Sequence, residues 1–230
     1  MINKIKLSLV LLVIAISQSN ALIEVDITRG NLDPLPIAVS PLSAEKETED
    51  NLTKELKEEN IGQKISEVVE NNLKNSGLFN PLNKDAFLQK PDIAHLKPRF
   101  EDWSLIKAQA LITGKVTLVN EKLRVEFRLW DVLAGKEMMA LAFTTVPSNW
   151  RRVGHIITDK VYERLTGEKG YFDTRIIYVA EEGPKTKRIK KLAIMDQDGS
   201  NIKYLTLGNE LVLTPRFNPT NQMVTYLSYF

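Results

Sequence analysis

The sequence contains no cysteine among its 230 residues. This absence excludes disulfide bonds, thiol catalysis and cysteine-ligated metal, and it excludes attachment to a membrane through a lipidated cysteine. The fold must therefore depend on the burial of apolar side chains. These make up 43% of the chain, an ordinary share for a globular protein.

Histidine is nearly absent too, since only His95 and His155 are present. No second histidine stands at metal-ligand spacing from either one, and we expect His155 to border the buried face of a helix. The sequence also lacks a Gly-x-Ser-x-Gly nucleophile elbow and a glycine-rich phosphate-binding loop. We therefore predict no catalytic residue, no bound metal and no cofactor.

A long apolar run is missing as well. The run from Leu7 to Ile16 is too short to cross a bilayer core, which takes about 20 apolar residues. It follows a short basic start and leads to a small-x-small site at Ser19 and Ala21. We interpret residues 1–21 as an export signal cleaved before Leu22, which predicts a periplasmic protein. The alternatives are an uncleaved anchor or a buried first helix, and the polar, strand-like residues after the site favour cleavage.

Charge of one sign is not in excess. The chain has 31 Lys and Arg against 29 Asp and Glu, and loss of residues 1–21 removes only Lys4 and Lys6, so the two signs become equal. A neutral protein has no global field that would steer it to nucleic acid or to an anionic membrane. We expect no nucleic-acid partner and no membrane insertion after signal cleavage.

The residues after the cleavage site alternate strictly in character. Ile23, Val25 and Ile27 are separated by Glu24 and Asp26, the pattern of a strand with one apolar and one charged face. A strand released at its N-terminus can add to the sheet edge of another protein. It can equally be an ordinary first strand of its own domain, and the pattern by itself does not decide between the two.

Residues 35–169 have the periodicity of an α+β domain. An amphipathic helix is predicted from about Ile61 to Asn75 with Gly77 as its left-handed cap, and another from Ser148, as N-cap, to Gly167. A strand is predicted at 37–39, a short helix at 101–107, and a three-stranded meander at 110–119, 123–129 and 137–146. We expect a mixed sheet with helices on one face.

Three stretches of this region lack a regular pattern. Residues 43–60 hold seven acids against three lysines and are interpreted as a solvated linker or an exposed helical extension. Residues 78–82 and 91–98 are expected to be irregular loops.

Residues 170–230 are expected to be all-β. Strands are predicted at 175–179, 191–195, 202–207 and 223–227, and Tyr178 and Tyr226 lie 48 residues apart, a spacing typical of propeller blades. Asp196-x-Asp198-Gly199 is interpreted as a hairpin turn, because a calcium loop would need Glu where Leu207 stands. The basic segment 185–191 is interpreted as a solvated hairpin. We predict an incomplete β-propeller of about one blade and one strand.

Several motifs resemble the TolB family of periplasmic Tol-Pal proteins. Near the C-terminus, residues 215–219 stand where that family has Pro-x-Trp-Ser-Pro, with Phe217 for Trp and Asn218 for Ser. The other matching segments are Asn75–Leu82, Ile112–Val116, Leu129–Asp131, Asn149–His155 and, as the most specific, Val161–Val179. The resemblance covers nearly all of the mature chain and departs from the family at the acidic residues 43–60.

The resemblance implies a non-enzymatic adaptor that links TolA of the inner membrane to the outer-membrane lipoprotein Pal. Such an adaptor supports outer-membrane integrity and constriction at cell division. The implied TolA-binding segment, residues 22–34, has as its candidate residues Leu22, Ile23, Glu24, Val25, Asp26, Ile27 and Asp33. The family has a six-bladed propeller on which Pal docks, so we expect a truncated product that has lost Pal binding and kept TolA binding.

Two other functions stay open on the residues alone. One is the remnant of a propeller-containing hydrolase that lacks its catalytic domain. The other is a structural or solute-binding periplasmic module without a Tol partner.

Overall fold

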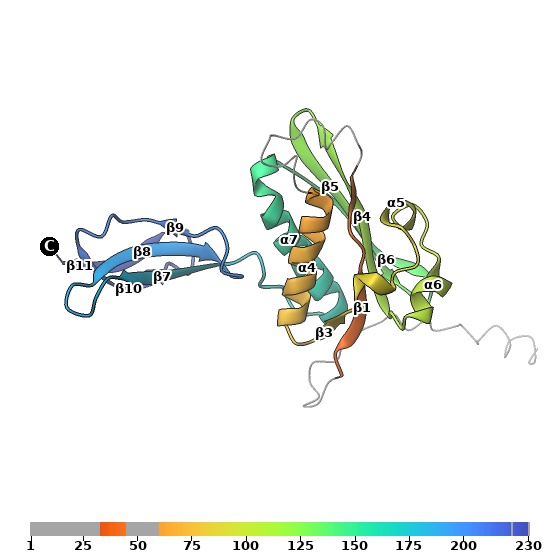
Figure 1. The fold of residues 1–230 in the computed structure, drawn as a ribbon, viewed down its shortest axis with the longest axis horizontal. Coiled ribbons are helices and arrows are strands. Elements are labelled where there is room, and N and C mark those ends of the chain that lie inside the picture. Colours follow the sequence, from red (N-terminus) through yellow and green to blue (C-terminus); the bar gives the residue numbers. More distant parts are fainter. Residues whose placement is uncertain (1–32, 45–59, 222, 230) are drawn as a thin grey trace, which may run out of the picture.

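The computed structural model describes residues 33–44, 60–221 and 223–229. They form an α+β N-terminal domain followed by two small β-sheets of an incomplete propeller (Figure 1). Within these ranges, no helix is both long enough and apolar enough to span a membrane.

The N-terminal domain is built on a mixed six-stranded sheet with the order β3-β1-β4-β5-β6, in which β2 also pairs with β4. Strand β1 runs parallel to β3 on one side and to β4 on the other, whereas β4, β5 and β6 form the predicted antiparallel meander. The strands are β1 (Leu35–Val39), β2 (Ser43–Ala44), β3 (Phe79–Pro81), β4 (Ala110–Val119), β5 (Lys122–Asp131) and β6 (Lys136–Thr145).

Two long helices, α4 (Ile61–Asn75) and α7 (Trp150–Thr166), cover one face of this sheet (Figure 1). Each buries the apolar stripe that its 3.6-residue period predicts. Helix α7 ends where predicted, at Gly167 in the left-handed conformation with φ 75°. The core between helices and sheet includes Ile61, Ile65, Val69, Leu73, Val153, Ile157, Val161 and Leu165.

A smaller layer lies on the opposite face of β1 and β4. It contains α5 (Pro91–Ala94) and α6 (Phe100–Leu105), and it buries Trp103 to 1% exposure. The indole Nε1 of Trp103 donates a hydrogen bond to Oε1 of Gln89 at 3.1 Å, so the one polar atom of this ring is satisfied. The sequence predicted helices on one face, and the structure adds this second layer.

Local predictions failed where pairing with a distant segment decides the structure. Ser43 and Ala44 are not linker but strand β2, with Ser43 only 9% exposed beside Lys115 and Val116 of β4; residues 45–59 lie outside the described residues. Residues 79–81 are not loop but strand β3, which is too short to show an alternating pattern.

Helix predictions differed from the structure at three places. The short helix predicted at 101–107 is α6, at Phe100–Leu105. Residues 91–94 form α5, because Pro91 occupies the first helical turn, where its missing N–H costs nothing. Ser148 is not an N-cap: residues 147–149 form a 3₁₀ turn and α7 begins at Trp150, after Asn149. The cap side chain of α4, by contrast, is Asn60, which accepts a hydrogen bond from the amide of Gln63.

The C-terminal part has a three-stranded sheet β7-β8-β9 and a hairpin β10-β11, and β10 packs against β7 and β8. Strand β10 was missed because Thr214 has φ 48° and precedes Pro215, and the resulting bulge interrupts the alternation. The predicted strand at 202–207 is reduced to two residues. The strands are β7 (Arg175–Glu182), β8 (Ile189–Asp196), β9 (Lys203–Tyr204), β10 (Leu211–Phe217) and β11 (Val224–Tyr229).

Candidate functional site

The predicted partner-binding residues Leu22–Ile27 lie outside the described residues, as do the cleavage-site residues Ser19 and Ala21. Of the predicted site only Asp33 is described. It is exposed and lies two residues before β1, which is hydrogen-bonded to a strand on each side. The described chain therefore begins next to an interior strand of the sheet.

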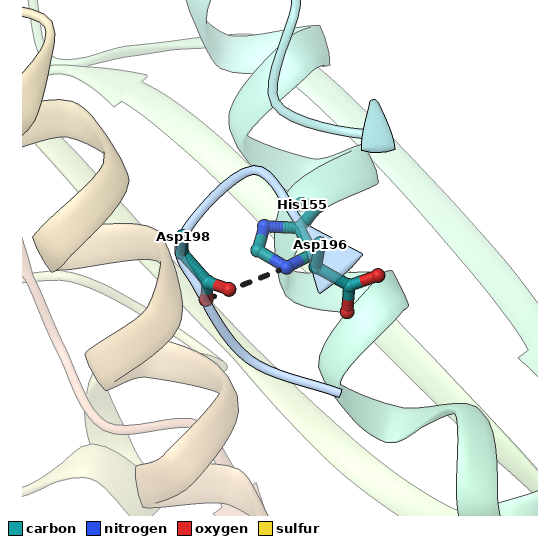
Figure 2. A group of neighbouring side chains, drawn as sticks. All are labelled: His155, Asp196 and Asp198. Carbon is teal, nitrogen blue, oxygen red and sulfur yellow. Dashed lines mark ion pairs between the residues drawn. The ribbon is translucent and has the colours of Figure 1, made fainter. Parts of the chain in front are cut away.

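A second candidate site lies where the turn after β8 meets helices α4 and α7 (Figures 1 and 2). The turn is the predicted one. Gly199, with φ 83°, donates its N–H to the carbonyl of Asp196 at 3.0 Å, and the amide of Ser200 donates to Oδ1 of Asp198 at 3.0 Å. A left-handed residue is needed here, and glycine supplies it without steric cost. The turn thus holds two carboxylates in place.

His155 of α7 faces this turn and is only 2% exposed. Its Nδ1 lies 2.9 Å from Nδ2 of Asn72 on α4. The orientation of the Asn72 amide follows from its other partners. Nδ2 also lies 3.2 Å from the hydroxyl of Thr158, which itself donates to the Gly154 carbonyl, and Oδ1 accepts from Nε2 of Gln197 at 2.9 Å. Nδ1 of His155 is therefore an acceptor, and the ring proton is on Nε2.

The proton on Nε2 points towards acids without reaching them. Nε2 has no hydrogen-bond partner among the described residues, and Oδ2 of Asp198 is 3.6 Å away. Burial lowers the pKa of His155 and outweighs the nearby carboxylates of Asp198 and Asp196, which act in the opposite direction. The imidazole is therefore neutral at pH 7.

Arg151 ties the turn to the first turn of α7. Its Nε and one terminal nitrogen donate to Oδ2 of Asp198 at 3.0 and 2.6 Å, and both side chains are largely buried. Burial alone would raise the pKa of Asp198. The amide of Ser200 and the guanidinium of Arg151 outweigh it, so the pKa of Asp198 lies below its ordinary value.

The chain between α7 and β7 is held by a further carboxylate. Asp159 accepts hydrogen bonds from the amides of Phe172 and Asp173 at 2.6 and 3.1 Å, and Asp173 in turn pairs with Arg152. Gly170 packs directly on Asp159, where a Cβ would overlap its backbone. These contacts fix the direction in which the propeller strands leave the N-terminal domain.

The surfaces of α7, β8 and the segment before β7 enclose a polar pocket of about 220 Å³. Its lining includes Arg151, Arg152, His155, Asp173, Arg175, Asp196 and Lys203. Ligand atoms of His155, Asp196 and Asp198 all lie within 4.8 Å of one another, so these are the described residues that could hold a metal ion.

Sequence reasoning placed His155 and the turn correctly but did not bring them together. Asn72 and Gln197 were missed entirely. The available signal was Asn72 itself, an amide on the apolar face of a predicted helix, because a buried amide needs partners. The basic segment 185–191 offers less free charge than its sequence indicates, since Arg188 and Lys190 pair with Glu181 and Lys191 pairs with Glu182.

Comparison with known proteins covers both parts of the chain. Residues 23–138 match the TolB amino-terminal domain, and residues 162–230 match the TolB beta propeller domain. The chain is 81% identical over 221 residues to the Tol-Pal system protein TolB of Pelagibacter ubique (strain HTCC1062), which is 96% of this chain and 50% of that protein. It thus spans about half the length of this relative.

A solved structure shares the fold. The crystal structure of TolB from Acinetobacter baumannii superposes with a TM-score of 0.69 at 23% identity, over 86% of this chain and 44% of that one. The sequence match to both domain families, the close relative and the shared fold agree. The chain belongs to the TolB family of Tol-Pal system proteins.

Proposed function

We propose that the chain is a non-enzymatic periplasmic adaptor that binds TolA through Leu22–Ile27, with Asp33 at the end of the binding segment. The observation that carries the proposal is the 81% identity to a Tol-Pal system protein over nearly the whole chain. Both matching domain families are TolB domains, which favours the adaptor over a hydrolase remnant or a module without a Tol partner. In the family the adaptor links TolA to Pal and supports outer-membrane integrity and constriction at division, and the 230 residues of this chain supply the TolA-binding end of that link.

Strand addition is the binding mode that the alternating residues support. In that mode, main-chain hydrogen bonds provide the affinity, and the apolar side chains of Ile23, Val25 and Ile27 fix the register. A strand attached to β1 transmits force to the centre of the sheet, because β1 is bonded to β3 and β4. This is an arrangement suited to a protein that couples two membranes.

The junction at His155 supports a scaffold role. Its polar groups are engaged with one another across segments: Arg151 with Asp198, Asn72 with Gln197, and Arg152 with Asp173. Such contacts hold the propeller strands against α7.

A titration of the 230-residue chain with the periplasmic part of TolA tests the binding segment. Val25→Pro removes one ladder N–H and clashes with extended pairing, so binding should be lost. Val25→Thr keeps both the N–H and the strand preference, and it should bind with affinity close to that of the parent. Deletion of residues 22–33 should abolish binding and leave the circular dichroism spectrum of the domain in place.

Equal calorimetric affinity of parent, Val25→Pro and the deletion would refute the binding segment. The proposal places Pal on loops from several propeller blades, so a polypeptide of these 230 residues, in which the described strands beyond α7 are β7–β11, should not bind Pal by itself. Native-affinity capture of Pal by the chain would show that one blade suffices.

A further inference from the structure

The residues that could ligate a metal come from segments far apart in the sequence. His155 lies on α7, Asp196 ends strand β8, and Asp198 lies in the turn that follows (Figure 2). Ligand spacing along the sequence gives no sign of this cluster, which only the docking of the turn on α7 creates.

The unpartnered nitrogen is the second observation. Nε2 of His155 is buried and has no hydrogen-bond partner among the described residues. It lies 3.6 Å from Oδ2 of Asp198 (Figure 2), and a carboxylate oxygen of Asp196 lies within 4.8 Å of the other two ligand atoms. Buried polar atoms in native proteins nearly always have a partner, which can be an ordered water or an ion. A buried, unpartnered nitrogen with two carboxylates within 4.8 Å fits a cationic ligand.

We propose that His155, Asp196 and Asp198 bind a divalent metal ion of the Zn²⁺ type, which fastens the turn after β8 to helix α7. One imidazole nitrogen and two carboxylate oxygens are ligands that Zn²⁺ takes, with a fourth position left for water. At Zn–N and Zn–O distances near 2.1 Å, tetrahedral ligand atoms lie about 3.4 Å apart. The Nε2–Oδ2 distance of 3.6 Å between His155 and Asp198 already has this size.

Binding changes the tautomer of His155 without releasing a proton from the ring. The proton on Nε2 moves to Nδ1, and Asn72 turns its amide so that Oδ1 accepts from Nδ1–H. Two neighbours of this amide turn as well. The Gln197 amide, which donates to Oδ1 in the metal-free form, presents its oxygen to Nδ2, and the Thr158 hydroxyl donates to Oδ1 in place of the Gly154 carbonyl. Metal-bound histidines characteristically donate their other N–H to such an acceptor. Asn72 is therefore a positioning residue of the site.

Arg151 competes with the metal for Asp198. It donates two hydrogen bonds to Oδ2, and the Ser200 amide occupies Oδ1. Asp196 is less engaged: Asn201 donates to its Oδ2, and the nearest nitrogen of Arg175 is 3.9 Å from its Oδ1. Loss of the Arg151 cation should therefore strengthen metal binding, an effect that a purely structural role of the cluster does not produce.

Titration of the chelator-treated 230-residue chain with ZnCl₂, followed by calorimetry and by thermal unfolding, tests the site. We expect one ion per chain and a higher unfolding temperature with the metal bound. Asp196→Asn should weaken binding at least tenfold, and Arg151→Gln should strengthen it. His95→Gln, which removes the other histidine, is the matched control and should bind like the parent.

Asn72→Asp provides a separate readout, because a carboxylate is a stronger acceptor for Nδ1–H and should also tighten binding. His155→Gln should lose binding; its circular dichroism spectrum establishes whether it folds, and Asp196→Asn decides the question if it does not. Absence of stoichiometric binding by the parent up to millimolar Zn²⁺ overturns the proposal. So does equal affinity in Asp196→Asn, or tighter binding of Ca²⁺ than of Zn²⁺.

Discussion

Helix α7 packs on α4 at Gly154, and the substitution Gly154→Ala tests how firmly this contact sets the spacing of the two helices. A Cβ at this position would lie 2.8 Å from Cγ1 and 2.9 Å from Cβ of Val68, which is 4% exposed. Ordinary carbon contacts are about 3.5–4.0 Å. Because Cβ of Val68 belongs to the stem of the side chain, no rotamer change removes the overlap.

Two contributions of opposite sign decide how Gly154→Ala changes the free energy of unfolding. Alanine in a helix interior is favoured over glycine by about 1 kcal/mol, whereas overpacking of a close-packed core costs about 1–3 kcal/mol. Because both contacts with Val68 fall below 3.0 Å, we expect overpacking in the upper part of that range, about 2–3 kcal/mol, and therefore a net loss of about 1–2 kcal/mol in the free energy of unfolding. For a chain of this size that corresponds to a fall of roughly 2–8 °C in Tm.

A second substitution, Val68→Ala, tests whether the cost of Gly154→Ala comes from the contact with Val68. Alone, it removes two buried methyl groups and should cost about 1–3 kcal/mol. Combined with Gly154→Ala, it opens the space that the new methyl needs, so the double variant should be more stable than the sum of the single effects by about 1–2 kcal/mol. The assay is guanidinium unfolding of the four proteins, monitored by tryptophan fluorescence.

Gly167→Ala is the control for loss of glycine as such. Gly167 has φ 75°, and no atom lies within 4 Å of a Cβ built there. The substitution should cost about 1–2 kcal/mol, because alanine disfavours the left-handed conformation. Since Gly167 has no contact with Val68, this cost should add to that of Val68→Ala. A Gly154→Ala variant as stable as the parent, or strictly additive effects in the double variant, would refute the close-contact argument.

Three further predictions concern other parts of the chain. The pKa of Asp198 is lower in the folded protein than its ordinary value of 3.8, so its contribution to stability is present above that value and is lost as the pH falls through the folded pKa. Asp198→Asn should therefore unfold at a lower denaturant concentration than the parent at pH 7, and the difference between the two midpoints should shrink below about pH 3.8. A constant difference between the midpoints down to about pH 2 would contradict this. Asp159→Ala removes the acceptor of the Phe172 amide and should lower the free energy of unfolding by about 2 kcal/mol. It should also speed protease cleavage near Gly170, and an unchanged cleavage rate would count against this role of Asp159. N-terminal sequencing of the exported protein should find Leu22 first, whereas an intact Met1 in a membrane fraction would exclude cleavage.

Much of the α+β domain could be predicted because its main elements are long and periodic. Helix α4 and strand β4 have the predicted bounds, since 15 and 10 residues are enough for the 3.6- and two-residue periods to repeat. Strands β2 and β3 have two and three residues and could not be found this way. Their backbone pairs with β4 and β1, and such pairing leaves no local pattern.

The sequence by itself determined the family, the amphipathic helices, the meander and the turn around Gly199, because each depends on neighbouring residues or on a contiguous motif. Only the tertiary structure decided what His155 does. Its hydrogen-bond partner Asn72 belongs to α4, and the nearby Asp198 belongs to the turn after β8. Both lie beside His155 because α7 packs on α4 and this turn lies against α7. Side-chain hydrogen bonds and metal-ligand distances act over about 2–4 Å in space and are indifferent to separation along the chain, so no spacing rule could have revealed this cluster.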